Sequence, residues 1–149
     1  MEVGVMTEKP IVVGVDGTTD GERALVWALD EAATRGCPLH VVSAWDYEPL
    51  ADWTEQAETL ARRRAETIMD NALRRAADRP QPPAVVRRAV RGPAAEVLES
   101  EATGAAMLVL AAHTGGGLRR SAFGRALLGT TSTHCVRRAP APVVVLPAR

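Results

Sequence analysis

The sequence has few of the residues that would tie it to a disulfide scaffold, a metal centre or a membrane. It contains only two cysteines, Cys37 and Cys135, which form neither a CxxC motif nor a pair at zinc-ligand spacing, so two buried thiols are expected. Its longest apolar run, residues 105–112, is far shorter than the roughly 18 residues that a membrane span needs. The amino terminus has neither the basic region nor the apolar segment of a signal peptide. We therefore expect a soluble, cytoplasmic protein with no membrane partner.

Aromatic residues are also scarce, which argues against nucleic acid as a partner. Phe123 is the only aromatic residue after Trp53, and the arginines of that half are not interleaved with aromatic side chains. Disorder is excluded by composition, because 46% of the residues are hydrophobic and 24% are charged. A chain of 149 residues can bury a core of its own, so we expect a single domain over residues 1–149.

Acidic residues are missing from the last third of the chain. The net charge is zero, but it combines −6 in residues 1–75 with +6 in residues 76–149, and no Asp or Glu follows Glu101. Two interpretations stay open: the arginines of this acid-free segment attract an anion, or they pair with acidic residues of the first half. The arginines concerned are Arg119, Arg120, Arg125, Arg137, Arg138 and Arg149.

Short apolar runs alternate with helical patterns along the chain, with no internal repeat and no low-complexity linker. The apolar runs predict strands over residues 11–15, 39–45, 84–90, 107–112 and 143–146. The helical patterns cover residues 19–35, 54–77, 93–102 and 123–138, and the spacing of Thr19 and Glu22 predicts a capping box that begins the first helix. This alternation predicts an α/β fold, a five-stranded, mostly parallel sheet in a doubly wound α/β sandwich.

In such a sheet a ligand lies outside the carboxyl ends of the strands, where the strand order reverses. The first strand is followed there by Asp16-Gly17-Thr18. The spacing of the glycines is not that of a dinucleotide fingerprint, and a carboxylate suits hydroxyl or amine donors, such as a ribose or an adenine edge. The alternative is that Asp16 only caps the following helix.

The fourth predicted strand is followed by a loop rich in glycine and arginine, with Gly115, Arg119 and Arg120, and then by Gly129-Thr130-Thr131-Ser132 at the start of a helix. Backbone amides, helix N–H groups, hydroxyls and guanidinium groups can together bind a phosphate. The P-loop pattern Gly-Lys-Ser/Thr is absent. A solvated glycine loop without a ligand is the alternative.

Several strings of the sequence resemble, in order, the universal stress protein family over nearly the whole chain. They are IVVGVDGT at residues 11–18, VVSAW at 41–45, LLGT at 127–130 and APVVV at 141–145. The resemblance implies the family fold, an adenine nucleotide alpha-hydrolase-like α/β sandwich. It also implies binding of ATP, with Mg²⁺ at its phosphates, by a protein of the stress response.

The family's binding residues can be carried over onto matching positions. Asp16 matches the aspartate that contacts the nucleoside, Ala44 matches an adenine-wall position, and Gly129 with Thr130 matches a closing Gly-Ser/Thr. The opening Gly-x2-Gly of the family motif is not intact, because Ala112 precedes Gly115, and thirteen residues then separate Gly115 from Gly129, more than the motif has. The implied set is Asp16, Gly17, Thr18, Ala44, Leu110, Ala112, His113, Gly115, Arg119, Arg120, Gly129, Thr130, Thr131 and Ser132.

The resemblance further implies a homodimer formed through the strand Val143–Leu146, whose flanking prolines are typical of a sheet edge. No nucleophile motif occurs, and His113 has no carboxylate near it in sequence, so at most slow ATP hydrolysis is expected. A second hypothesis is a dimeric interaction scaffold of the same fold that has lost ATP. Its protein partner would contact the acidic, aromatic segment Asp46–Trp53.

Overall fold

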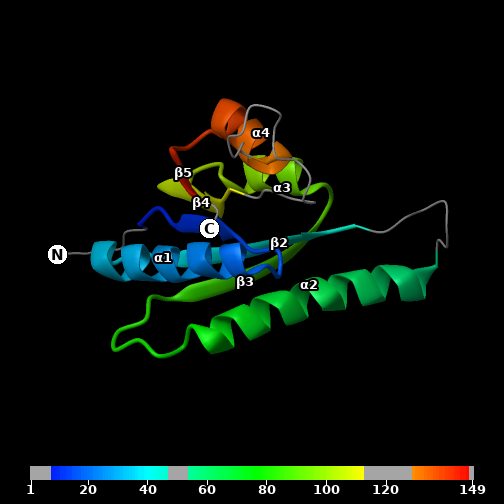
Figure 1. The fold of residues 1–149 in the computed structure, drawn as a ribbon, viewed down its shortest axis with the longest axis horizontal. Helices are drawn as coiled ribbons and strands as arrows, with labels where there is room; N and C mark the ends of the chain where they lie inside the picture. The colour runs from blue at the N-terminus through cyan, green and yellow to red at the C-terminus, as the bar shows by residue number, and fades with distance from the viewer. Residues whose placement is uncertain (1–7, 47–53, 113–128, 148–149) are drawn as a thin grey trace.

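The computed structural model describes residues 8–46, 54–112 and 129–147, and within them strands and helices alternate as the sequence predicts (Figure 1). The helix predicted over residues 123–138 is described from Thr130 onward. The elements are β1 (Ile11–Gly14), α1 (Thr19–Arg35), β2 (Leu39–Trp45), α2 (Glu55–Arg75), β3 (Val85–Arg91), α3 (Ala94–Glu101), β4 (Met107–Ala111), α4 (Thr130–Arg138) and β5 (Val143–Leu146).

The strands form one sheet in the order β3-β2-β1-β4-β5, and all the pairings are parallel. Ile11 of β1 is in register with Leu39 of β2 on one side and with Met107 of β4 on the other. The chain therefore builds outward from β1 in one direction and then crosses over to continue from β4 in the other. The strand order reverses between β1 and β4, which is where the sequence predicts a ligand.

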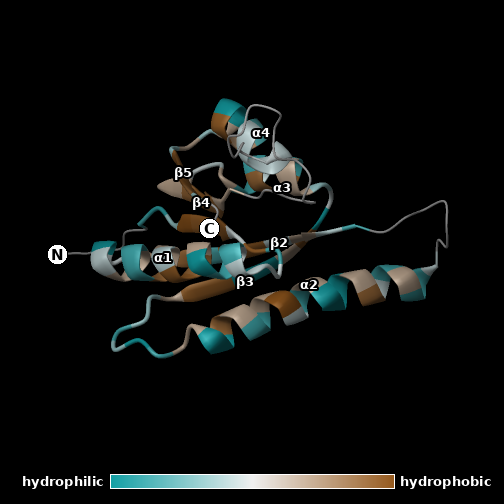
Figure 2. Cartoon of the chain, in the orientation of Figure 1, coloured by the Kyte–Doolittle hydropathy of each residue, from teal (hydrophilic) through white to brown (hydrophobic). Residues whose placement is uncertain are grey.

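Helices cover both faces of the sheet, with α1 and α2 on one face and α3 and α4 on the other (Figure 1). Successive strand residues point to opposite faces. Val13 therefore belongs to the core under α1 and α2 with Leu25, whereas Val12 belongs to the core under α3 and α4 with Leu98. Burial on both faces explains why the central strands β1 and β4 are continuous apolar runs, as the hydropathy colouring shows (Figure 2).

Both cysteines are buried and free, as the sequence predicts. Burial raises the pKa of the Cys135 thiol, and the charge of Glu99 raises it further, so the thiolate is disfavoured. In the part of the chain that the structure describes, no helix is long and apolar enough to cross a membrane.

The pH dependence of stability should include a contribution from His40. His40 is half-buried on β2, on the face that carries Arg88 and Glu101; burial and then the charge of Arg88 lower its pKa, and Glu101 opposes them. Because the folded pKa lies below the unfolded value of about 6.5, the unfolded chain binds more protons as the pH falls through this range. Stability should therefore fall from pH 7.5 to pH 5.5, and less so in His40→Gln. Urea unfolding at both pH values measures this, and equal losses in the two proteins would contradict it.

Candidate functional site

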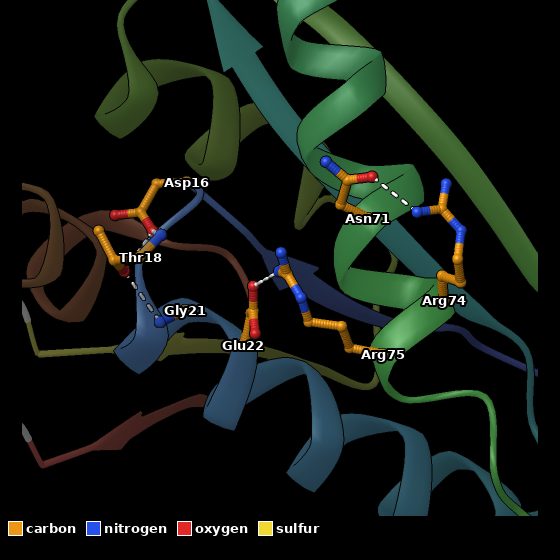
Figure 3. A network of polar contacts seen from close by, with 7 residues as sticks. All are labelled: Asp16, Thr18, Gly21, Glu22, Asn71, Arg74 and Arg75. Carbon is orange, nitrogen blue, oxygen red and sulfur yellow. Dashed lines mark hydrogen bonds and ion pairs between the residues drawn. The ribbon is translucent and has the colours of Figure 1, made fainter.

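The turn between β1 and α1 is organised by the side chain of Asp16. Its Oδ1 accepts hydrogen bonds from the Thr18 backbone N–H at 3.0 Å and from the Thr18 hydroxyl at 2.6 Å. The Thr18 oxygen in turn accepts the N–H of Gly21 at 3.0 Å (Figure 3). Thr18, with extended backbone angles, is thus the N-cap of α1. The helix begins at Thr19 as predicted, but the predicted capping role of Thr19 belongs to Thr18, because Asp16 orients Thr18 for it.

Asp16 supports the helix cap and still faces solvent. The residue is exposed, and the bonds described for its carboxylate use Oδ1. Gly17 has φ +86°, a conformation that L side chains rarely adopt. A Cβ on Gly21 would lie 2.6 Å from Asp16 Oδ1, so only glycine fits against the carboxylate. The sequence analysis did not identify Gly21, because its role depends on this close approach.

Helix α2 borders the same turn. A Cβ on Gly17 would lie 3.5 Å from the Ile68 side chain, so α2 passes beside the turn. Farther along α2, Arg75 forms an ion pair with Glu22 of α1 (Figure 3). This pair connects the two helices on one side of the Asp16 turn. Both partners are solvent-accessible, so the pair adds little to stability.

The carboxyl end of β4 lies beside that of β1, because the two strands are neighbours. The backbone N–H of Ala112 donates to the Leu146 carbonyl at 2.7 Å, so this amide is used within the sheet. Leu110 and Ala112 are 4% and 6% exposed. Leu110 belongs to the core under α3 and α4, and Ala44 is half-buried and packs against that core. These three apolar positions therefore line the core at the strand ends.

The amino end of α4 presents donor groups without acidic residues in its first turn. Gly129 is the N-cap and provides no side-chain capping bond. The first N–H groups of an α-helix have no partner within the helix itself. Thr130 is exposed and Thr131 is half-buried. Ser132 is 1% exposed, and its hydroxyl donates to the Ala111 carbonyl at 3.3 Å. The helix dipole, and N–H groups that have no partner within the helix, make this end favourable for an anion.

Polar side chains of α4 contact a carboxylate of α3. Nε2 of His134 lies 2.7 Å from Oε1 of Glu99, and Nε of Arg138 lies 3.8 Å from the same oxygen. Arg138, from the acid-free segment, therefore pairs with an acidic residue within residues 76–149 and not with one within residues 1–75. Pairs between the halves do exist before the acid-free segment, and they are Arg79 with Asp30, Arg87 with Asp70, and Arg91 with Glu58.

Among the residues predicted to bind a ligand, Asp16, Gly17 and Thr18 follow β1, and Gly129–Ser132 begin the helix that follows β4. Their topology places both groups at the carboxyl edge of neighbouring strands. His113, Gly115, Arg119 and Arg120 lie outside the described residues. Across the described ranges no three His, Cys, Asp or Glu residues group as a metal site.

Comparison with known proteins gives one consistent family. The universal stress protein family model matches residues 8–147. A universal stress protein of Mycolicibacterium smegmatis is 32% identical over 145 residues, which cover 94% of this chain and 46% of that protein. The chain thus spans about half the length of the curated relatives it matches.

Solved structures of this family share the fold. One is a universal stress protein in complex with cAMP, with a TM-score of 0.72, 22% identity, and coverage of 93% of this chain and 96% of that one. Another is a family member from Arabidopsis thaliana with AMP bound, with a TM-score of 0.58, 15% identity, and coverage of 95% and 93%. The five-stranded α/β sandwich predicted from the sequence is therefore confirmed.

Proposed function

Because this chain belongs to the universal stress protein family, we propose that it binds an adenine nucleotide at the carboxyl edge of its sheet. The observation that carries the proposal is the exposed Asp16 carboxylate, which Thr18 holds at the end of β1. The neighbouring strand β4 is followed along the chain by α4, and the first turn of α4 offers N–H and hydroxyl donors. A carboxylate for ribose hydroxyls and a helix end with partial positive charge for phosphate are complementary to the two halves of a nucleotide.

Family members in complex with cAMP and with AMP support an adenine nucleotide as the ligand class. ATP is the ligand that we propose, with Mg²⁺ bound through its phosphates. The residues that we propose to contact the ribose are Asp16, Gly17 and Thr18. The phosphates would contact the N–H groups and hydroxyls at the start of α4. The Ala112 amide is already bonded to Leu146, so it does not serve as a phosphate donor.

We further propose that the protein works as a homodimer formed through β5. This strand pairs with β4 on one side only and lies at the edge of the sheet, with each of its residues partly exposed. Val136 of α4 is 52% exposed. It lies 200° around the helix from His134, which faces α3, so Val136 is on the side away from α3. Apolar residues of β5 and α4 together thus suit a second copy of the chain.

In this proposal nucleotide occupancy is the signal of a cytoplasmic stress-response regulator, and catalysis is not its task. A scaffold without a nucleotide is the competing hypothesis from the sequence. The two hypotheses differ in a single measurable property, the effect of a nucleotide on the stability of the purified protein.

We expect saturating AMP or ATP–Mg²⁺ to raise the Tm of the protein. A ligand at one hundred times its Kd stabilises the folded state by about 2.7 kcal/mol. For a domain of this size that corresponds to a rise of about 5–10 °C. Thermal unfolding over a concentration series measures the shift, with Mg²⁺ alone and GMP as controls. An unchanged Tm at millimolar AMP and ATP would contradict nucleotide binding and favour the scaffold.

A further inference from the structure

Strand β4 continues beyond the last residue that it pairs with β1. The last registered pair between β1 and β4 is Val13 with Val109, whereas β4 remains paired with β5 up to Ala111 and Leu146. Backbone groups of successive strand residues point to alternate sides, and the Ala112 N–H points to β5. The Ala111 carbonyl therefore points to the β1 side, beyond the last pair. A carbonyl in such a place needs a donor from another element.

Ser132 provides that donor. Its hydroxyl donates to the Ala111 carbonyl at 3.3 Å, and its side chain is 1% exposed. Ser132 and Ser43 are the two polar residues buried among those that the structure describes. Because Ser132 lies in the first turn of α4, this bond connects the amino end of the helix to the end of β4 at the reversal of the strand order.

Resting on the nucleotide site proposed above, we propose that Ser132 is a positioning residue. It holds the first turn of α4 against the end of β4, the neighbour of the strand that the Asp16 turn follows. The groups left to contact a phosphate are the free N–H groups with the hydroxyls of Thr130 and Thr131, which are at least partly exposed. This differs from the role that the family resemblance implies for Ser132, which is to lie beside the phosphates.

Ser132→Ala tests this role, because it leaves the Ala111 carbonyl without its donor. We expect its affinity for AMP to fall about tenfold, the loss of one buried hydrogen bond, while its affinity for adenosine stays unchanged. Hydrogen exchange of the Thr133 N–H, which donates to the Gly129 carbonyl at 2.9 Å, should become about tenfold faster. Thr131→Val is the matched control, since it removes a neighbouring hydroxyl and keeps the Ser132 bond. It should lower AMP affinity without changing exchange. Titration calorimetry and exchange mass spectrometry give the two readouts.

Three results for Ser132→Ala would overturn the positioning role. Lower AMP affinity with unchanged exchange would make the hydroxyl a direct ligand. Equal losses for AMP and adenosine, or faster exchange with full AMP affinity, would make the bond a general structural contact. Failure of the proposed function is seen separately, because the unmodified protein would then bind neither AMP nor adenosine.

Discussion

Asp16→Asn should bind AMP and ATP about 10- to 100-fold more weakly than the unmodified protein and should keep its fold. A hydrogen bond to a charged group contributes about 1.5–3 kcal/mol, and about 1.4 kcal/mol corresponds to a factor of ten in affinity. The asparagine side chain keeps an oxygen that can accept from the N–H and hydroxyl of Thr18, so the turn is preserved. Titration calorimetry measures the affinity, and urea unfolding should show a free energy of unfolding within about 0.5 kcal/mol of the original.

Asp30→Asn is the matched control for this loss of charge. Asp30 lies on α1, the helix that follows the Asp16 turn, and pairs with Arg79 rather than with that turn. The Asp30→Asn variant loses the same charge but keeps the Asp16 turn unaltered. Its nucleotide affinity should therefore remain unchanged. Equal weakening in both variants would indicate a general electrostatic effect and would contradict a ligand contact at Asp16.

Gly21→Ala disturbs the same carboxylate from the other side. The new Cβ would lie 2.6 Å from Asp16 Oδ1, so the carboxylate has to move. Nucleotide affinity should fall even though alanine favours the helix by about 1 kcal/mol over glycine. In the Asp16→Asn background the same change should cost much less affinity, because the two changes act on one contact. Additive losses would show that Gly21 acts independently of Asp16.

The fold was predictable from the sequence because the central strands β1 and β4 are buried on both faces. Runs such as Ile11–Val15 carry no polar alternation, and glycine or proline separates them from the helices. The left-handed C-cap of α1 at Gly36 was likewise visible as a glycine after a helical pattern. Local composition and tertiary burial point to the same structure at these positions.

The details of the candidate site were less predictable, because they depend on side-chain contacts that spacing patterns do not record. Thr18, and not the predicted Thr19, is the N-cap because Thr18 bonds to Asp16, and a helical spacing pattern does not record that bond. The bond of Ser132 to Ala111 joins residues that are 21 positions apart. The family resemblance also places Leu110 and Ala112 among the ligand contacts, and the burial of both side chains is a tertiary feature that the resemblance does not give.

Val145→Pro should convert the proposed dimer into a monomer and leave the sheet of each protomer intact. The carbonyls of Pro142, just before β5, and of Leu146 at its end accept from the N–H groups of Leu108 and Ala112. Backbone groups alternate along a strand, so the N–H and carbonyl of Val145 point away from β4, toward the open edge. Proline removes that outward N–H without breaking the β4 ladder, and edge strands tolerate it. Around a two-fold axis the change acts twice, so the Kd for dimerisation should rise at least about tenfold.

Val145→Thr is the control, because it keeps both the backbone N–H and the β-branched shape and should remain dimeric. Sedimentation equilibrium over a range of protein concentrations measures the mass of each form. Far-UV circular dichroism and AMP affinity should be the same in all three proteins, since the Asp16 turn and the start of α4 both lie outside β5. An unmodified protein that sediments as a monomer at tens of micromolar would contradict the proposed dimer. A dimer that survives Val145→Pro would place the self-association away from this edge. In the second case the exposed Val85 and Val86 of β3, at the opposite edge of the sheet, would become the next position to test.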